Sequence, residues 1–209
     1  PTDWADIATT SFFPAKPLGC YGDGGAIITN EAALAERIES LRVYGKVTPT
    51  DAATRNFHHD PKYLSLRVGM NSRLDTIQAA ILLEKLKIFA DEIERRQVVA
   101  ARYQAGLKGR IKGVPEVIEG GRSVWAQYVI EHDNRDGLQA HLTANGIPSM
   151  VYYPVPIHQQ DFALRFAPPA GHLKVTEAAS QHVLALPMHP YLGEADQDRV
   201  IETVLGFNG

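Results

Sequence analysis

The sequence contains one cysteine, no long apolar run and no cluster of lysine and arginine. A single cysteine excludes an internal disulfide and fits a reducing cytoplasm, where we expect this protein to act. No apolar run approaches the ~20 residues of a membrane span, and we expect neither a membrane segment nor a signal peptide. The net charge of −3, with a pI near 6.3, makes nucleic acids and anionic membranes poor partners.

The chain is large enough to bury a core. Its 209 residues, of which 44% are hydrophobic, suffice for one or two domains. The sequence begins with Pro1 rather than methionine, and an expected strand, Ile7–Phe13, follows within a few residues. Such a start is typical of the middle of a larger chain.

The segment from Ser11 to Gly25 has the most unusual composition. Lys16 lies between Pro14 and Pro17, behind two phenylalanines. The prolines exclude helix, and the apolar neighbours are expected to leave the ammonium poorly solvated, which favours the free amine. A desolvated amine on a rigid loop suits a Schiff base with a carbonyl compound. The alternative is a structural loop whose lysine reaches out to water.

Four glycines close this segment: Gly19, Gly22, Gly24 and Gly25. Glycine permits positive φ and close backbone approach, as a phosphate or a flat cofactor requires. The spacing matches neither a Walker loop nor a dinucleotide fingerprint. Taken alone, the glycines therefore favour a turn that joins two strands, the second being a buried strand at residues 26–29.

A helix and a long irregular connection should follow. Asn30 is expected to cap the helix. Its apolar stripe consists of Leu34, Ile38 and Leu41. Residues 45–72 show no period, and a connection this long is usually functional or mobile. The pair His58-His59 lies within it, but adjacent side chains rarely converge as tetrahedral ligands, so we predict no metal site.

Two consecutive helices are predicted next, at residues 76–89 and about 92–107. A capping box at Asp91–Glu94 separates them. The charged face of the second helix is expected to be solvated; it comprises Glu92, Glu94, Arg95 and Arg96. This passage should link a larger domain, residues 1–90, to a smaller one, residues 91–209.

The last hundred residues have the pattern of an α+β unit. The expected strands are residues 123–130, 147–153 and 185–187, and the expected helices are residues 136–145, 175–184 and 194–205. A proline-broken segment at residues 152–160 contains His158. This histidine could orient a substrate, although a lone histidine more often makes one structural hydrogen bond.

Four blocks of sequence together resemble a known family. They are Ser11-Phe-Phe-Pro-Ala-Lys16-Pro-Leu-Gly, Gly24-Gly-Ala-Ile, Gly69-Met-Asn71-Ser-Arg73-Leu-Asp-Thr-Ile-Gln78-Ala-Ala and Tyr153-Pro-Val-Pro-Ile-His158-x-Gln160. In this order they closely resemble the pyridoxal-phosphate-dependent nucleotide-sugar aminotransferases of the DegT/DnrJ/EryC1/StrS family. The implied fold is that of aspartate aminotransferase (fold type I), an α/β fold. The Lys16 block most resembles enzymes that aminate the 3-keto position of a UDP-linked hexuronic acid for surface polysaccharides such as lipopolysaccharide.

The resemblance implies a role for each matching residue. Lys16 would form the internal aldimine with pyridoxal 5'-phosphate and then act as the base that moves a proton. Ser11 would bind the cofactor phosphate, and Asn71 would do so from across a homodimer interface. The implied nucleotide-sugar ligands are Arg73, Tyr153 and His158. Glutamate would load the amino group, and a keto-sugar would accept it.

The family's remaining cofactor residues precede the lysine: an aspartate on the ring nitrogen, a stacked aromatic residue and a phosphate-binding loop. Only a short stretch precedes Lys16 here, and Asp3 and Asp6 lie too close to it to serve as the ring partner. The resemblance therefore covers the second half of a family member, with a partial α/β large domain and an α+β small domain. We expect weak or no transamination from this chain alone, and an exposed half-sheet that favours a homodimer or larger assembly.

Three functions remain open at this point. The chain is an aminotransferase or part of one, a non-catalytic homologue that binds pyridoxal phosphate or a nucleotide-sugar, or an interaction fragment. The presence of Lys16 argues against the second. The sequence does not specify which keto-sugar is used or which carbon is aminated.

Overall fold

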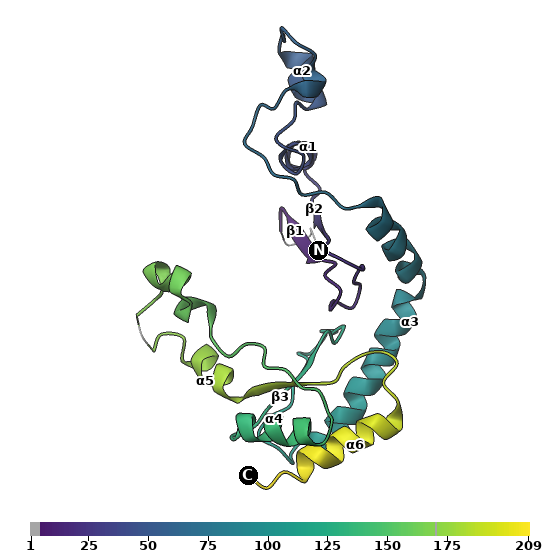
Figure 1. The fold of residues 1–209 in the computed structure, drawn as a ribbon, viewed down its shortest axis with the longest axis vertical. Coiled ribbons are helices and arrows are strands. Elements are labelled where there is room, and N and C mark those ends of the chain that lie inside the picture. The colour runs from purple at the N-terminus through teal and green to yellow at the C-terminus, as the bar shows by residue number, and fades with distance from the viewer. Residues whose placement is uncertain (1–4, 170) are drawn as a thin grey trace. The chain divides into compact units, whose positions relative to one another are not determined.

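A computed structural model describes residues 5–169 and 171–209 (Figure 1). Pro1 and Asp3, considered above, lie outside these residues. The chain divides into two units, the first ending at Ile88 and the second running from Phe89 to Gly209. No helix in the described part of the chain has the length and apolar character needed to cross a membrane.

The first unit begins with two short antiparallel strands, β1 (Ala8–Ser11) and β2 (Gly25–Ile28). Their register pairs Ser11 with Gly25, so the segment 12–24 is a long hairpin loop. The second strand was expected to be buried, but Ile27 and Ile28 are exposed. The reason is that, among the described residues of this unit, Cys20 and Leu82 are the only fully buried apolar side chains. This unit does not cover its own sheet.

Helix α1 (Ala32–Leu41) follows β2. The expected cap at Asn30 is wrong by one position, because Glu31 is the N-cap and makes no capping bond through its side chain. The Thr29 hydroxyl accepts a hydrogen bond from Glu31 N at 3.1 Å instead. The predicted stripe of Leu34, Ile38 and Leu41 is half-buried.

The connection at residues 45–72 is not irregular throughout, which corrects the prediction. Helix α2 (Pro49–Thr54) begins with a capping box between Thr48 and Asp51, and a single 3-10 turn, η1 (Pro61–Tyr63), follows. The Asp51 carboxylate, 6% exposed, accepts two hydrogen bonds from the Arg67 guanidinium at 2.7 and 3.0 Å. This pairing lowers the pKa of Asp51 and ties the two ends of the connection together.

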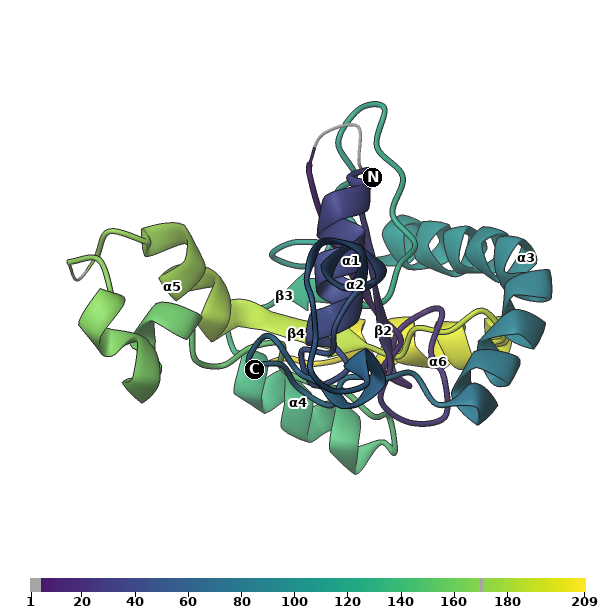
Figure 2. The same cartoon turned by 90° about the horizontal axis from the view of Figure 1, so that it is seen from above.

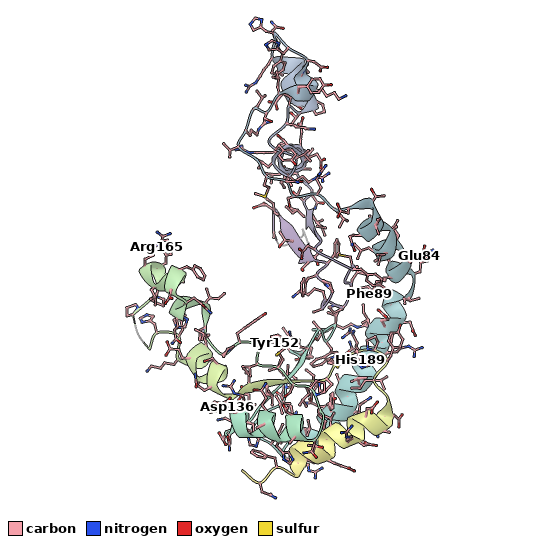
Figure 3. The ribbon with its side chains drawn as sticks, in the orientation of Figure 1. Glu84, Phe89, Asp136, Tyr152, Arg165 and His189 are labelled. Atoms are coloured by element: carbon pink, nitrogen blue, oxygen red, sulfur yellow. The ribbon has the colours of Figure 1, made fainter. Side chains whose placement is uncertain are left out.

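Helix α3 (Thr76–Leu107) is one continuous helix, where two were predicted. The Asp91 carboxylate does not cap a new helix but pairs with Arg95 one turn later, at 2.7 Å. The face predicted to be solvated is partly buried, because Glu92 and Arg96 are each 8% exposed. The Tyr191 hydroxyl donates to Glu92 at 2.8 Å, and Arg96 donates to Trp125 O at 2.9 Å. Figure 3 labels Phe89 on this helix, where the second unit begins.

The sheet of the second unit pairs β3 (Tyr128–Glu131) with β4 (Val183–Leu186) in antiparallel register. Gly113 adds a bridge beside β3, and Met150 adds one beside β4. Strand β3 covers only the end of the strand predicted at residues 123–130. Of the strand predicted at residues 147–153, Met150 alone pairs with the sheet. The remaining helices agree closely with prediction and are α4 (Arg135–Ala144), α5 (Lys174–His182) and α6 (Glu194–Leu205).

The core of the second unit lies between this sheet and helices α3, α4 and α6, which are visible together in Figure 2. Its largest fully buried side chains include Tyr103 from α3, Tyr128 from β3 and Leu138 from α4. The Tyr103 and Tyr128 rings lie 5.0 Å apart. The Tyr103 hydroxyl donates to Pro187 O at 2.9 Å, so this buried polar group is satisfied.

Candidate active site

Lys16 occupies a tight turn just after β1. The turn is closed by a hydrogen bond from Lys16 N to Phe13 O at 2.8 Å. The lysine side chain is exposed, and no partner for its ammonium is present among residues 5–169 and 171–209. The expected desolvation is therefore not found, because Phe13 and Pro14 are themselves exposed and do not cover the amine.

The backbone beneath this turn is closely packed. Cys20 N donates to Phe12 O, and Phe12 N donates to Gly24 O, each at 2.8 Å. A Cβ at Gly19 would lie 2.7 Å from Phe13 O, and one at Gly24 would lie 3.0 Å from the Cys20 sulfur. The loop therefore joins β1 to β2, as the glycine pattern favours, and it is too tightly packed for a side chain at Gly19 or Gly24. None of Gly19, Gly22, Gly24 and Gly25 adopts the positive φ that glycine permits.

Ser11 is the last residue of β1 and is exposed. Its hydroxyl oxygen accepts a hydrogen bond from Phe13 N at 3.2 Å, which shapes the start of the hairpin loop. The hydroxyl hydrogen is not used in that bond, so Ser11 can still donate to an anion.

Asn71 and Arg73 lie together on another segment of the same unit. This segment pairs with the chain after α1, since Met70 N donates to Leu41 O at 2.8 Å and Asn71 bridges to Val43. Arg73 Nε donates to Asn71 Oδ1 at 3.0 Å, and both side chains are exposed. The Asn71 amide NH2 remains available as a donor.

A cavity of about 1010 Å³ in the first unit is bounded by β1, β2, α1 and residues 71–74. Asn71 and Arg73 line it, together with charged groups on the loop and on α1. Ser11 and Lys16 do not line it. Of the four predicted site residues in this unit, the structure thus brings Asn71 and Arg73 together in one cavity.

Tyr153 and His158 belong to the second unit. Tyr153 is exposed, and its ring lies 5.5 Å from that of Tyr152, which is labelled in Figure 3. His158 is largely enclosed, since 13% of its side chain is exposed. Its Nε2 lies 3.1 Å from Glu177 Oε1 on α5. The single structural hydrogen bond weighed for His158 is therefore present, and Glu177 is a partner that sequence reasoning missed. Among the described residues, no cluster of three or more His, Cys, Asp or Glu side chains could hold a metal ion.

The model of the DegT/DnrJ/EryC1/StrS aminotransferase family matches residues 2–205. The chain is 48% identical over 189 residues to the UDP-2-acetamido-2-deoxy-3-oxo-D-glucuronate aminotransferase of Pseudomonas aeruginosa, covering 90% of this chain and 48% of that protein.

Solved structures are also similar to this chain over nearly its whole length. A DegT DnrJ EryC1 StrS aminotransferase from Brucella abortus is 50% identical, with a TM-score of 0.86, over 98% of this chain and 51% of that one. DesV from Streptomyces venezuelae, solved in complex with a ketimine intermediate, is 38% identical, with a TM-score of 0.82, over 95% of this chain and 50% of that one. The chain therefore spans about half the length of the relatives it matches.

Proposed function

We propose that this chain, which belongs to the DegT/DnrJ/EryC1/StrS aminotransferase family, carries the reactive lysine of an enzyme that moves an amino group from glutamate to a keto nucleotide-sugar. The observation that carries the proposal is the Lys16 amine, which is exposed and has no partner among the described residues, on a turn fixed by backbone hydrogen bonds. Its exposure makes it accessible to the aldehyde of pyridoxal phosphate, with which a lysine condenses once its amine has lost its proton.

Pyridoxal phosphate, when bound, supplies the electron sink that allows an amino group to be exchanged for a keto group. The side chains of the first unit fit such a group by type. Lys16 would hold the aldehyde carbon and, once released, would carry a proton to or from the substrate carbon. Ser11 and Asn71 each retain a hydrogen-bond donor suited to a phosphate oxygen.

Arg73, Tyr153 and His158 are the side chains that we assign to the nucleotide-sugar. A guanidinium matches the oxygens of a diphosphate because it donates from a planar fork. The relative from Pseudomonas aeruginosa acts on a UDP-linked 3-oxo-glucuronate, as its name states. We extend that substrate class, a 3-keto hexuronic acid on UDP, to the enzyme that contains this chain. Its product would serve surface polysaccharide synthesis.

The exposed strands of the first unit indicate that further polypeptide is needed to complete the enzyme. Ile27, Ile28 and Phe13 are exposed beside the lysine loop, while the second unit buries a full core. Exposed apolar area of this kind calls for a covering surface. We therefore propose that turnover requires more protein around β1 and β2, including a second subunit, and that the 209 residues alone turn over weakly or not at all.

The decisive experiment is an absorption spectrum of the chain with pyridoxal phosphate, followed by borohydride reduction and peptide mapping. We expect a visible band and a stable adduct on the peptide that contains Lys16. Lys16→Arg should abolish the adduct, whereas Lys108→Arg, which alters an exposed lysine paired with Glu116, should leave it unchanged. Adducts scattered over many lysines, or no band, would overturn the assignment of Lys16. Incubation with glutamate then separates an amino-transferring site from one that only binds the cofactor.

A further inference from the structure

Two side chains of α3 hold the loop that carries Lys16. Gln78 Oε1 accepts a hydrogen bond from Tyr21 N at 2.7 Å. Seven residues later, Lys85 Nζ donates to Gly19 O and lies 5.8 Å from the centre of the Tyr21 ring. A spacing of seven residues is two helical turns, so both side chains leave the same face of the helix. Each satisfies a backbone group of the loop, one an N–H and the other a C=O.

These contacts continue to the lysine turn itself. Gly19, whose carbonyl Lys85 holds, packs directly against the turn, because a Cβ there would lie 2.7 Å from both Phe13 O and Pro14 O. Phe13 O is the acceptor that closes the turn at Lys16. A continuous series of contacts thus runs from α3 through Gly19 to the backbone of Lys16.

We propose that Gln78 and Lys85 are positioning residues for Lys16: they fix the hairpin loop on α3 and so set the place from which the amine reacts. The proposal rests on the proposed function, since it assigns a purpose to the loop that presents the reactive amine. A reacting group must be held within about 0.5 Å of its productive place. Among the described residues, the side chains outside the loop that hydrogen-bond its backbone are those of Ser11, Gln78 and Lys85. Neither Gln78 nor Lys85 was assigned a role from the sequence.

Cys20 provides a reporter within the loop. It is the only cysteine, it is 1% exposed, and its sulfur lies 3.0 Å from both Phe12 O and Gly22 O. A thiol reagent can reach it only when the loop opens. The rate of thiol modification therefore measures loop opening without any cofactor.

The first test is this labelling rate in the 209-residue chain and its variants. Gln78→Leu keeps the volume but removes the acceptor, and Lys85→Met keeps the aliphatic chain but removes the donor. Loss of one hydrogen bond should accelerate labelling by about 2- to 12-fold for Gln78→Leu, and by at least as much for Lys85→Met, whose donor is charged. Gln78→Glu retains an acceptor oxygen and should restore the slow rate. Lys87→Met is the matched control, because Lys87 pairs with the exposed Glu84 on the same helix, away from the loop.

The second test asks whether the support reaches Lys16. The rate of borohydride-trapped attachment of pyridoxal phosphate to Lys16 should fall in Gln78→Leu and Lys85→Met, and the pH midpoint of the visible band should move. Both should return to normal in Gln78→Glu. Circular dichroism at each step verifies that the variants are folded.

The outcomes separate the two proposals. Faster Cys20 labelling with unchanged attachment at Lys16 would mean that the contacts are merely structural, which overturns the positioning role. Unchanged labelling in both variants would overturn the claim that Gln78 and Lys85 hold the loop. If the parent chain attaches no cofactor at Lys16, the proposed function fails and the positioning role fails with it. This holds even where the labelling rates show that Gln78 and Lys85 hold the loop.

Discussion

The substitution Gly19→Ala would place a methyl group directly against the turn that carries Lys16. Its Cβ would lie 2.7 Å from the carbonyl oxygens of Phe13 and Pro14, whereas ordinary contact begins at 3.4 Å. The atoms must therefore separate by about 0.7 Å. The obstacles are backbone atoms, and the Gly19 carbonyl is itself held by Lys85, so neither side can move without disturbing another contact.

The hydrogen bond from Lys16 N to Phe13 O is the contact most affected by this displacement. It measures 2.8 Å, and a retreat of the acceptor by this amount takes it beyond the ~3.2 Å limit of an N–H···O bond. One such bond contributes about 0.5–1.5 kcal/mol net, which corresponds to a change of about 2- to 12-fold in the opening equilibrium. Amide hydrogen exchange of peptides covering residues 12–24, measured by mass spectrometry, reports this change directly.

The matched control is Gly193→Ala, at the N-cap of α6. There the backbone has φ −67°, and the nearest atom to an added Cβ is Asp196 Oδ2 at 3.7 Å. Exchange in residues 12–24 should not change in this variant. If residues 12–24 of Gly19→Ala exchange their amide hydrogens at the rate of the parent chain, the carbonyls of Phe13 and Pro14 move aside at little cost. Close packing then does not fix the lysine turn.

Three further predictions concern charge and burial. Hydrogen bonds from Arg67 hold the pKa of Asp51 below its ordinary value of 3.8. The stability that this carboxylate contributes is therefore present above about pH 4 and is lost as the pH falls further. Asp51→Asn should make the free energy of unfolding, followed by circular dichroism, depend less on pH in this acid range. Burial raises the pKa of Tyr128 from 10.0 to about 12, so stability should fall as the pH rises through that interval. Tyr128→Phe should weaken this dependence in alkaline unfolding, and the remainder should persist because burial also raises the pKa of Tyr103. Glu177→Ala removes the partner of His158 and should speed trypsin cleavage of the segment before α5 several-fold, measured on gels.

The helices that the sequence predicts well are those whose local signals agree with their tertiary surroundings. Helix α6 has the bounds that its periodicity indicates, and α4 differs by one residue at each end. The false break in α3 shows the limit of local signals. Asp91–Glu94 matches a capping box, but the helix continues because Glu92 and Arg96 find partners on distant segments. Those partners carry no signal in the local sequence.

Helix α2 was missed although a signal for it is present. Thr48, Pro49 and Asp51 form a capping box with proline at the first helical position. The helix is only six residues long, too short for a periodic apolar face. Its stability depends on the contact of Asp51 with Arg67, which lies outside the window in which a helix is recognised.

The sequence suggests Lys16 as the reactive residue but gives no sign of the side chains that hold its loop. Lys16 is identifiable because lysine between prolines is rare and because the surrounding block matches a family. Gln78 and Lys85 were missed because they bind the main chain of the loop. An N–H or C=O is present at nearly every residue, so a side chain that binds one leaves no complementary residue in the sequence.

The exposure of the matching blocks itself supports a functional interpretation of them. Ser11, Lys16, Asn71, Arg73 and Tyr153 are all exposed, so packing within these two units does not account for their identity. In the second unit, by contrast, the apolar residues that build the core are explained by burial alone. Exposed polar residues held on a fixed backbone are the usual form of a binding or catalytic surface. Packing within the two units therefore leaves the identity of these five residues open to a functional explanation, which the proposed aminotransferase site supplies.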